Sequence, residues 1–167
     1  ATGTDDAGNP ISATADSTHS VDTAGTGTVT VDAITADDVI NASEAGGTVA
    51  VTGTTGGELA EGDSVSFTVN GTDYSATVAA DGSWSADVAG SDLAADTAFT
   101  VTATGTDDAG NPISATADST HSVDTTGTGT VTVDNITADD VINATEAAGT
   151  VAVTGTTGGE LAEGDSV

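Results

Sequence analysis

The sequence contains no lysine and no arginine among its 167 residues, whereas aspartate and glutamate together number 27. A formal charge of −27 repels nucleic acid and anionic lipid, so the composition excludes nucleic acid and direct membrane contact. The only side-chain cations that can form are those of His19 and His121. The carboxylates must therefore be hydrated, hydrogen-bonded, protonated or neutralised by a cation from solution.

Cysteine and methionine are absent as well, so neither a disulfide nor a thiolate metal site can form. No apolar run approaches the ~20 residues that a membrane-spanning helix needs. The lack of methionine, with Ala1 first, indicates an internal piece of a longer polypeptide. Leu, Ile, Val and Phe make up only 29 of the 167 residues, which is typical of chains that do not fold unaided.

The sequence repeats itself with a period of 102 residues. Residues 1–65 return at 103–167 with four differences, which are Ala24/Thr126, Ala33/Asn135, Ser43/Thr145 and Gly46/Ala148. A Thr- and Gly-rich joint at 125–130 matches 23–28 and reads as a boundary between units. We therefore expect one complete repeat at 26–127, the C-terminal part of a preceding repeat at 1–25, and the N-terminal part of a following repeat at 128–167.

Within that unit the apolar residues alternate with a period of two, as in strands with one wet face. Seven runs show the alternation, at 29–31, 49–51, 65–69, 74–78, 84–88, 99–103 and 113–117. Asn70-Gly71 and Asp81-Gly82 fall between successive runs and predict hairpins. These patterns predict an all-β fold of tandem immunoglobulin-like antiparallel β-sandwich repeats. We also expect a short helical turn at 91–97 that points Leu93 inward.

Carboxylate and amide oxygens gather near the strand ends and on both sides of the joint. Calcium takes six to eight such hard oxygen donors, whereas magnesium keeps its water and zinc favours Cys and His. The alternative is that the acids are solvated charge that keeps the polymer soluble. The candidate metal ligands are Asp22, Asp32, Asp37, Asp38, Asp107, Asp108, Asn111, Asp124, Asp134, Asp139 and Asp140.

Three stretches resemble the bacterial immunoglobulin-like extender repeats of RTX-type and biofilm-associated giant adhesins. They are ITADDVINASEAGGTVAVTGT at 34–54, TVNGTDYSATVAADGSW at 68–84 and TDDAGNPISATA at 106–117. The resemblance implies neighbouring repeats as partners in a secreted, outer-membrane-anchored array on the bacterial cell surface that projects a distal ligand-binding region. It also implies calcium at the joints, carried here onto Asp124, Asp134, Asp139 and Asp140, with a second site at Asp107, Asp108 and Asn111.

Other functions are disfavoured. The small core leaves little room for the pocket that a catalytic carboxylate needs. His19 and His121 are interpreted as surface strand residues, so we expect that the chain is not an enzyme. A calcium-dependent carbohydrate- or surface-binding module is an alternative, but Trp84 alternates with Ala86 and Val88 and so belongs to the core. The Thr-x-Thr runs are ordinary for solvated strands rather than a sign of ice contact. Self-association of exposed strand edges at low pH is a further alternative.

Overall fold

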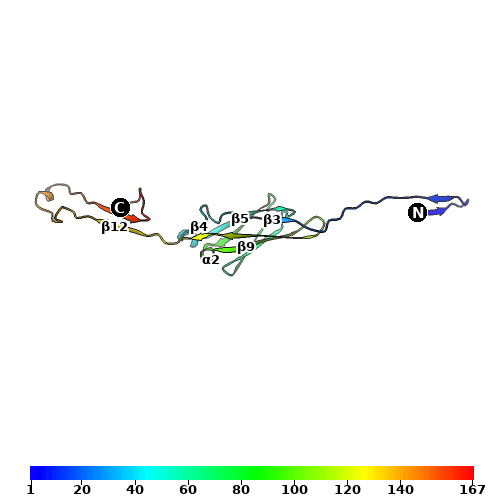
Figure 1. Cartoon of the computed structure of the whole chain (residues 1–167), viewed down its shortest axis with the longest axis horizontal. Coiled ribbons are helices and arrows are strands. Elements are labelled where there is room, and N and C mark those ends of the chain that lie inside the picture. Colours follow the sequence, from blue (N-terminus) through cyan, green and yellow to red (C-terminus); the bar gives the residue numbers. More distant parts are fainter.

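The alternating runs form two antiparallel sheets that pack face to face in the middle of the chain (Figure 1). The structure, a computed structural model, describes residues 1–167. One sheet has the order β10-β9-β6-β7, with β6 at Ser64–Val69, β7 at Thr72–Thr77, β9 at Ala98–Thr106 and β10 at Pro112–Thr120. The other has the order β3-β5-β8, with β3 at Gly27–Val29, β5 at Thr48–Gly57 and β8 at Ser83–Ala89. The predicted all-β sandwich is confirmed.

The core lies between these sheets and is built around a few aromatic rings. Phe67 stacks on Phe99 and Tyr74, with ring centroids 5.3 and 5.8 Å apart, and its ring lies 6.0 Å from Trp84 of the opposite sheet. Trp84 is 3% exposed, which confirms the prediction that it is a core residue. Valine fills most of the remaining inward positions, and four of these valines are completely buried on β5, β6 and β8 (Val51, Val65, Val69 and Val88).

One of the two predicted hairpins is wrong. Asn70-Gly71 joins β6 to its neighbour β7, and both residues have positive φ, 50° and 77°, as a tight hairpin turn requires. Asp81-Gly82 does make a turn, with a hydrogen bond from the Gly82 amide to the Ala79 carbonyl. However, β8 pairs with β5 rather than with β7, so this turn crosses from one sheet to the other. The Asp-Gly signal predicts the turn but not the partner strand.

Two very short strands and two short helices close the end of the sandwich from which the chain leaves. β4 (Val39–Ile40) and β11 (Ser122–Val123) pair in parallel. α1 (Ala42–Ala45) begins with a capping box formed by Asn41 and Glu44. α2 (Gly90–Ala95) is the expected helical turn, and its Leu93 is completely buried.

His121 lies between β10 and β11, and the prediction that it is a surface residue is wrong. Its side chain is 8% exposed, and its Nε2 lies 2.8 Å from the Leu93 carbonyl oxygen. A carbonyl oxygen can only accept a hydrogen bond, so Nε2 carries the proton and is the donor. The histidine therefore ties the end of the four-stranded sheet to α2. His19, its counterpart one period earlier in the sequence, is exposed.

Outside the sandwich, the chain extends to either side (Figure 1). Toward the N-terminus, β1 (Thr2–Thr4) and β2 (Pro10–Ser12) form a hairpin. Toward the C-terminus, β12 (Gly129–Val133) pairs with β13 (Gly155–Gly159), and a 3-10 turn, η1, covers Glu146–Ala148. No helix has both the length and the apolar character needed to cross a membrane.

Tyr74 links this core to α2, and its removal provides a first test of the packing. Its hydroxyl donates to Asp92 Oδ2 at 2.6 Å and accepts from the Ala89 amide at 3.3 Å. We expect Tyr74→Phe to lower the free energy of unfolding by about 1 kcal/mol, because both bonds are lost. Urea denaturation in chelator checks this, and Ser75→Ala, at an exposed neighbouring position, should leave stability unchanged.

The same pair predicts a pH dependence. The hydrogen bond from Tyr74 is the largest of the contacts that hold the pKa of Asp92 below its ordinary value of 3.8. A carboxyl whose pKa is lowered by folding adds stability above its unfolded pKa and loses it as the pH falls through the folded value. The deficit of Tyr74→Phe should therefore shrink when urea denaturation is repeated below pH 3.8. A stability deficit below pH 3.8 that equals the deficit at neutral pH would contradict this role of the Tyr74–Asp92 hydrogen bond.

Candidate metal centre

Three carboxylates meet where the chain enters the sandwich. One ligand oxygen from each of Asp22, Glu58 and Asp107 lies within 4.8 Å of the others. Asp22 immediately precedes the joint at 23–28, Glu58 follows β5, and Asp107 follows β9. Residues far apart in the sequence are therefore brought together at one pole of the domain. Two of them, Asp22 and Asp107, are predicted metal ligands, whereas sequence reasoning missed Glu58.

Backbone geometry at the end of β5 places Glu58. Gly57 has a φ of +75°, and a Cβ there would lie 2.7 Å from the Thr26 carbonyl oxygen, so only glycine fits this approach. Glu58 then makes three hydrogen bonds with Thr26. The Glu58 amide donates to the Thr26 carbonyl at 2.8 Å, and Oε2 accepts from the Thr26 amide at 2.6 Å and its hydroxyl at 2.8 Å. The carboxylate is thereby fixed against the joint.

Asp107 is held by the tight loop between β9 and β10. Its Oδ1 accepts from the Asn111 amide and its Oδ2 from the Asn111 side chain, both at 2.7 Å. The side-chain bond from Asn111 is the main cause that keeps the pKa of Asp107 below its ordinary value. Asp107 is therefore an anion at neutral pH even though it is only 8% exposed. Asn111 acts here as the support of a carboxylate.

The donor set suits a hard divalent cation. All three side chains offer carboxylate oxygens, and a chain without lysine or arginine cannot neutralise them internally. Three carboxylates this close repel one another, and the repulsion falls when an ion lies between them. Asp22 and Glu58 are exposed, so an ion would reach the cluster directly from solvent. Oxygen donors of this kind, completed by water and carbonyl groups, are those that calcium takes.

Most of the other predicted ligands make hydrogen bonds within their own turn or to an adjacent segment. Asp37, in the turn before β4, accepts a hydrogen bond from the Thr35 hydroxyl at 2.9 Å. This bond is the main reason that the pKa of Asp37 is lowered. Asp38 accepts from the Ile34 amide at 3.0 Å. The next copy repeats these bonds, with Asp139 accepting from Thr137 and Asp140 from Ile136. Asp32 accepts from Thr52 of β5, Asp134 accepts from Thr154 just before β13, and Asp108 is exposed. Metal ligation by these residues stays a prediction.

The second joint repeats part of the cluster. Asp124 and Glu160, which follow Asp22 and Glu58 by one period, line the same hollow as Asn41 and Ser43 of the sandwich. Glu160 Oε2 again accepts from the amide and hydroxyl of a threonine, Thr128. The structure does not gather Asp134, Asp139 and Asp140 with Asp124 into a cluster of metal-ligand spacing. Asp124 and Glu160 are thus the carboxylates that the second joint brings together.

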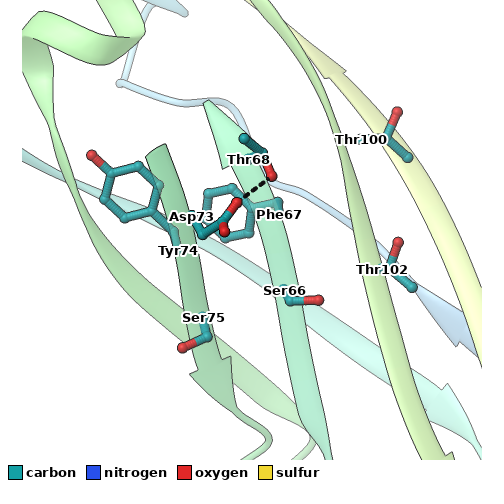
Figure 2. Close-up of a pocket in the computed structure, with 8 residues that line it drawn as sticks. All are labelled: Ser66, Phe67, Thr68, Asp73, Tyr74, Ser75, Thr100 and Thr102. Atoms are coloured by element: carbon teal, nitrogen blue, oxygen red, sulfur yellow. Dashed lines mark hydrogen bonds between the residues drawn. The ribbon is translucent and has the colours of Figure 1, made fainter. Parts of the chain in front are cut away.

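A second candidate site is a hollow of about 630 Å³ on the four-stranded sheet (Figure 2). Hydroxyl side chains surround it, and Thr68 donates to Asp73 at 2.7 Å across one edge. Phe67 is 5% exposed and so offers no free face on which a sugar could stack, and one face of the Tyr74 ring is covered by Phe67, with ring centroids 5.8 Å apart. The carboxylate cluster is therefore the better candidate for function.

Comparisons with known proteins identify relatives with this architecture. No protein-family model and no curated protein sequence matches the chain. Two solved structures each cover 98% of it. A Ca2+-stabilized adhesin that helps an Antarctic bacterium reach out and bind ice is 64% identical with a TM-score of 0.79. A 1.5-MDa bacterial ice-binding adhesin, studied for host cell surface retention, is 54% identical with a TM-score of 0.89.

The chain spans 40% and 53% of the length of these two solved structures, which are longer pieces of adhesin. A third structure is a single bacterial immunoglobulin-like domain from the M. primoryensis ice-binding adhesin. It is 62% identical with a TM-score of 0.56, and the match covers all of that domain and 62% of this chain. The chain therefore belongs to the family of bacterial immunoglobulin-like domains of large adhesins.

Proposed function

We propose that the chain is a calcium-stiffened structural extender of a large bacterial surface adhesin, which holds a distal ligand-binding region away from the cell. The observation that carries the proposal is the cluster of Asp22, Glu58 and Asp107, whose ligand oxygens lie within 4.8 Å of one another in a chain without basic side chains. An ion held there would bind the joint to the sandwich. Such a clamp at every repeat makes a flexible string of domains rigid.

The position of the cluster supports a role between repeats. Asp22 lies in the segment 1–25, which we assign to the preceding repeat, whereas Glu58 and Asp107 lie in the repeat at 26–127. The segment 128–167 then begins the following repeat. At this second joint, Asp124 and Glu160 correspond to Asp22 and Glu58. Threonine- and glycine-rich joints behave as flexible coils unless something holds them. The ion supplies that restraint from outside the polypeptide.

The relatives support the same function. One is described as a Ca2+-stabilized adhesin that reaches out, and another as an adhesin retained at a cell surface. We extend these descriptions to this chain as calcium binding and an extracellular position on a bacterial surface. Its partners are then the neighbouring repeats of the same polypeptide. The structure provides a scaffold and joints, and the proposed role needs no catalytic step.

Replacement of a single ligand tests the proposal. We expect Glu58→Gln to weaken calcium binding about tenfold or more, because affinity in oxygen sites follows the number of charged ligands. Isothermal titration calorimetry of the full chain measures the change. The matched control is Glu61→Gln, which removes the same charge from an exposed position in the same loop. Equal affinity in wild type and Glu58→Gln would disprove the assignment of this cluster.

A further inference from the structure

Asn70-Gly71, at the tip of the β6–β7 hairpin, is the only asparagine–glycine pair in the chain. Of the other asparagines, Asn9 and Asn111 precede proline, which has no backbone N–H, and the rest precede alanine or isoleucine. Asn70 and Gly71 are both exposed, and a Cβ on Gly71 would meet no atom within 4 Å. Solvent therefore reaches both residues, and no side chain hinders the Gly71 nitrogen.

The two residues carry the groups of an intramolecular substitution. The Asn70 side chain is a neutral amide, so its Cγ is an electrophile with a leaving group, Nδ2. The Gly71 amide donates no hydrogen bond within the chain, so its proton is free to pass to a base in solution. Attack of the Gly71 nitrogen on Cγ closes a five-membered ring, which is a favourable ring size.

Asp81-Gly82 is the other tight turn of this kind, and it lacks both features. The Ser83 hydroxyl donates to Asp81 Oδ1 at 2.6 Å and is the main cause that holds the pKa of Asp81 below its ordinary value. Asp81 is therefore a carboxylate at neutral pH, and a carboxylate is a poor electrophile. The Gly82 amide is also engaged, because it donates to the Ala79 carbonyl at 2.9 Å.

Two carboxylates of α2 hold the Asn70 amides in the folded domain. Nδ2 of Asn70 donates to Asp92 Oδ1 at 3.1 Å, and its backbone amide donates to Asp96 Oδ2 at 3.0 Å. Asp92 is fixed in turn, since its Oδ2 accepts from the Tyr74 hydroxyl at 2.6 Å. Ring closure requires the side chain to turn until Cγ meets the Gly71 nitrogen. A bond that holds Nδ2 in place opposes this rotation.

From these contacts we infer that Asn70 is a site of spontaneous covalent modification, in which the Gly71 nitrogen displaces ammonia, and that Asp92 slows the reaction. The Gly71 N–Cγ bond forms, the Cγ–Nδ2 bond breaks, and ammonia leaves with the proton of the Gly71 amide. Water then adds to one of the two carbonyl carbons of the succinimide ring and breaks its bond to nitrogen. Opening at Cγ gives aspartate, and opening at the backbone carbonyl carbon gives isoaspartate.

Either product weakens the hairpin. The donor to Asp92 is lost, and a new carboxylate lies beside Asp92 and Asp96, where like charges repel. Isoaspartate also adds one atom to the backbone of the turn, so Val69 and Thr72, which are paired at the end of the ladder, no longer match. β7 is an edge strand that pairs only with β6, so no second neighbour holds it. The reaction uses none of the proposed calcium ligands and is independent of the proposed function.

Mass spectrometry of the full chain, incubated while folded at mildly alkaline pH, tests the site. Chymotrypsin cleaves after Phe67 and Tyr74 and isolates Asn70 on the peptide 68–74, in a chain that trypsin cannot cut. We expect this peptide to show conversion of amide to acid, with isoaspartate among the products, before any other asparagine reacts. Asp81 should show no isomerisation over the same time. Earlier conversion of another asparagine, or an Asn70 that reacts only in the urea-unfolded chain, would overturn the inference.

Asp92→Ala tests the restraint. Loss of a hydrogen bond of about 1 kcal/mol should speed the conversion about fivefold. Asp92→Asn keeps an oxygen that accepts from Nδ2 and should react at nearly the wild-type rate. Asp87→Ala removes an exposed carboxylate from β8 and is the charge control. Tyr74→Phe frees Asp92 from its support and should act in the same direction, which keeps the test decisive if Asp92→Ala unfolds. Rates in Asp92→Ala and Tyr74→Phe that equal the rate in Asp87→Ala would disprove the role of Asp92.

Discussion

Chelation of calcium is expected to lower the melting temperature of the sandwich by about 10–20 °C. A ligand at 100 times its Kd stabilises the folded state by about 2.7 kcal/mol. In a domain of about 100 residues, each kcal/mol corresponds to about 4–8 °C. The chain is sensitive to such a loss, because its buried core contains only two phenylalanines and one tryptophan and relies otherwise on aliphatic side chains, chiefly valine.

Differential scanning calorimetry with calcium, with chelator, and with magnesium at the same concentration measures this effect. Magnesium should restore little of the lost stability, since it demands a stricter geometry and gives up water reluctantly. Hydrogen exchange locates the change. The amides of Ala24 and Thr26, which donate to Asp22 and Glu58, should lose protection in chelator before those of β5 and β8. A melting curve and an exchange pattern that are unchanged by calcium would refute the proposed calcium site at the joint.

Gly90→Ala is expected to destabilise the domain by about 3 kcal/mol or more, enough to unfold much of it without calcium. A Cβ on Gly90 would lie 1.8 Å from the Glu44 carbonyl oxygen and 2.7 Å from its carbon. Both are backbone atoms of α1, so the clash cannot be relieved by a change of side-chain rotamer. The Gly90 amide also donates to the Gly47 carbonyl at 2.9 Å, which holds α2 against α1.

Gly46→Ala is the control, measured with Gly90→Ala by urea denaturation in calcium and in chelator. A Cβ at Gly46 would make ordinary contacts at 3.6 Å, and the next copy of the repeat carries Ala148 at this position. The control should therefore remain within about 0.5 kcal/mol of wild type. If Gly90→Ala proves equally harmless, the contact between the two short helices is looser than the structure indicates.

The strands were predictable from sequence because each one leaves a local signal. Alternation with period two identifies β3 and β5 to β10, and Asn70-Gly71 identifies one hairpin. Pairing between strands is not local, which is why Asp81-Gly82 misled: β8 finds its partner in β5, more than twenty residues earlier. β4 and β11 have two residues each and are too short to show any period.

His121 illustrates a signal that was present and misread. The alternation that begins at Ile113 continues through Ala115, Ala117 and Ser119 to His121, so the pattern itself places the histidine on the inward face. Its polarity suggested a surface position instead. The structure reconciles the two, because the Leu93 carbonyl accepts the proton of the buried ring.

The metal centre was only partly predictable, for a different reason. The unbalanced charge favoured a cation, and the acids near the joint indicated Asp22 and Asp107 among other candidates. Glu58 lies 36 residues from Asp22 and 49 from Asp107, and nothing in its neighbourhood sets it apart from Glu61. Only the folded topology, with Gly57 turning the chain back to Thr26, puts it in the cluster.

The central claim is that an ion from solution joins each repeat to the next through carboxylates on both sides of the joint. A crystal structure of this chain grown in calcium tests it most directly, with anomalous scattering to locate the metal. The claim predicts an ion about 2.3–2.6 Å from oxygens of Asp22, Glu58 and Asp107. An ordered joint whose three carboxylates surround only water, with calcium bound elsewhere or nowhere, would contradict it.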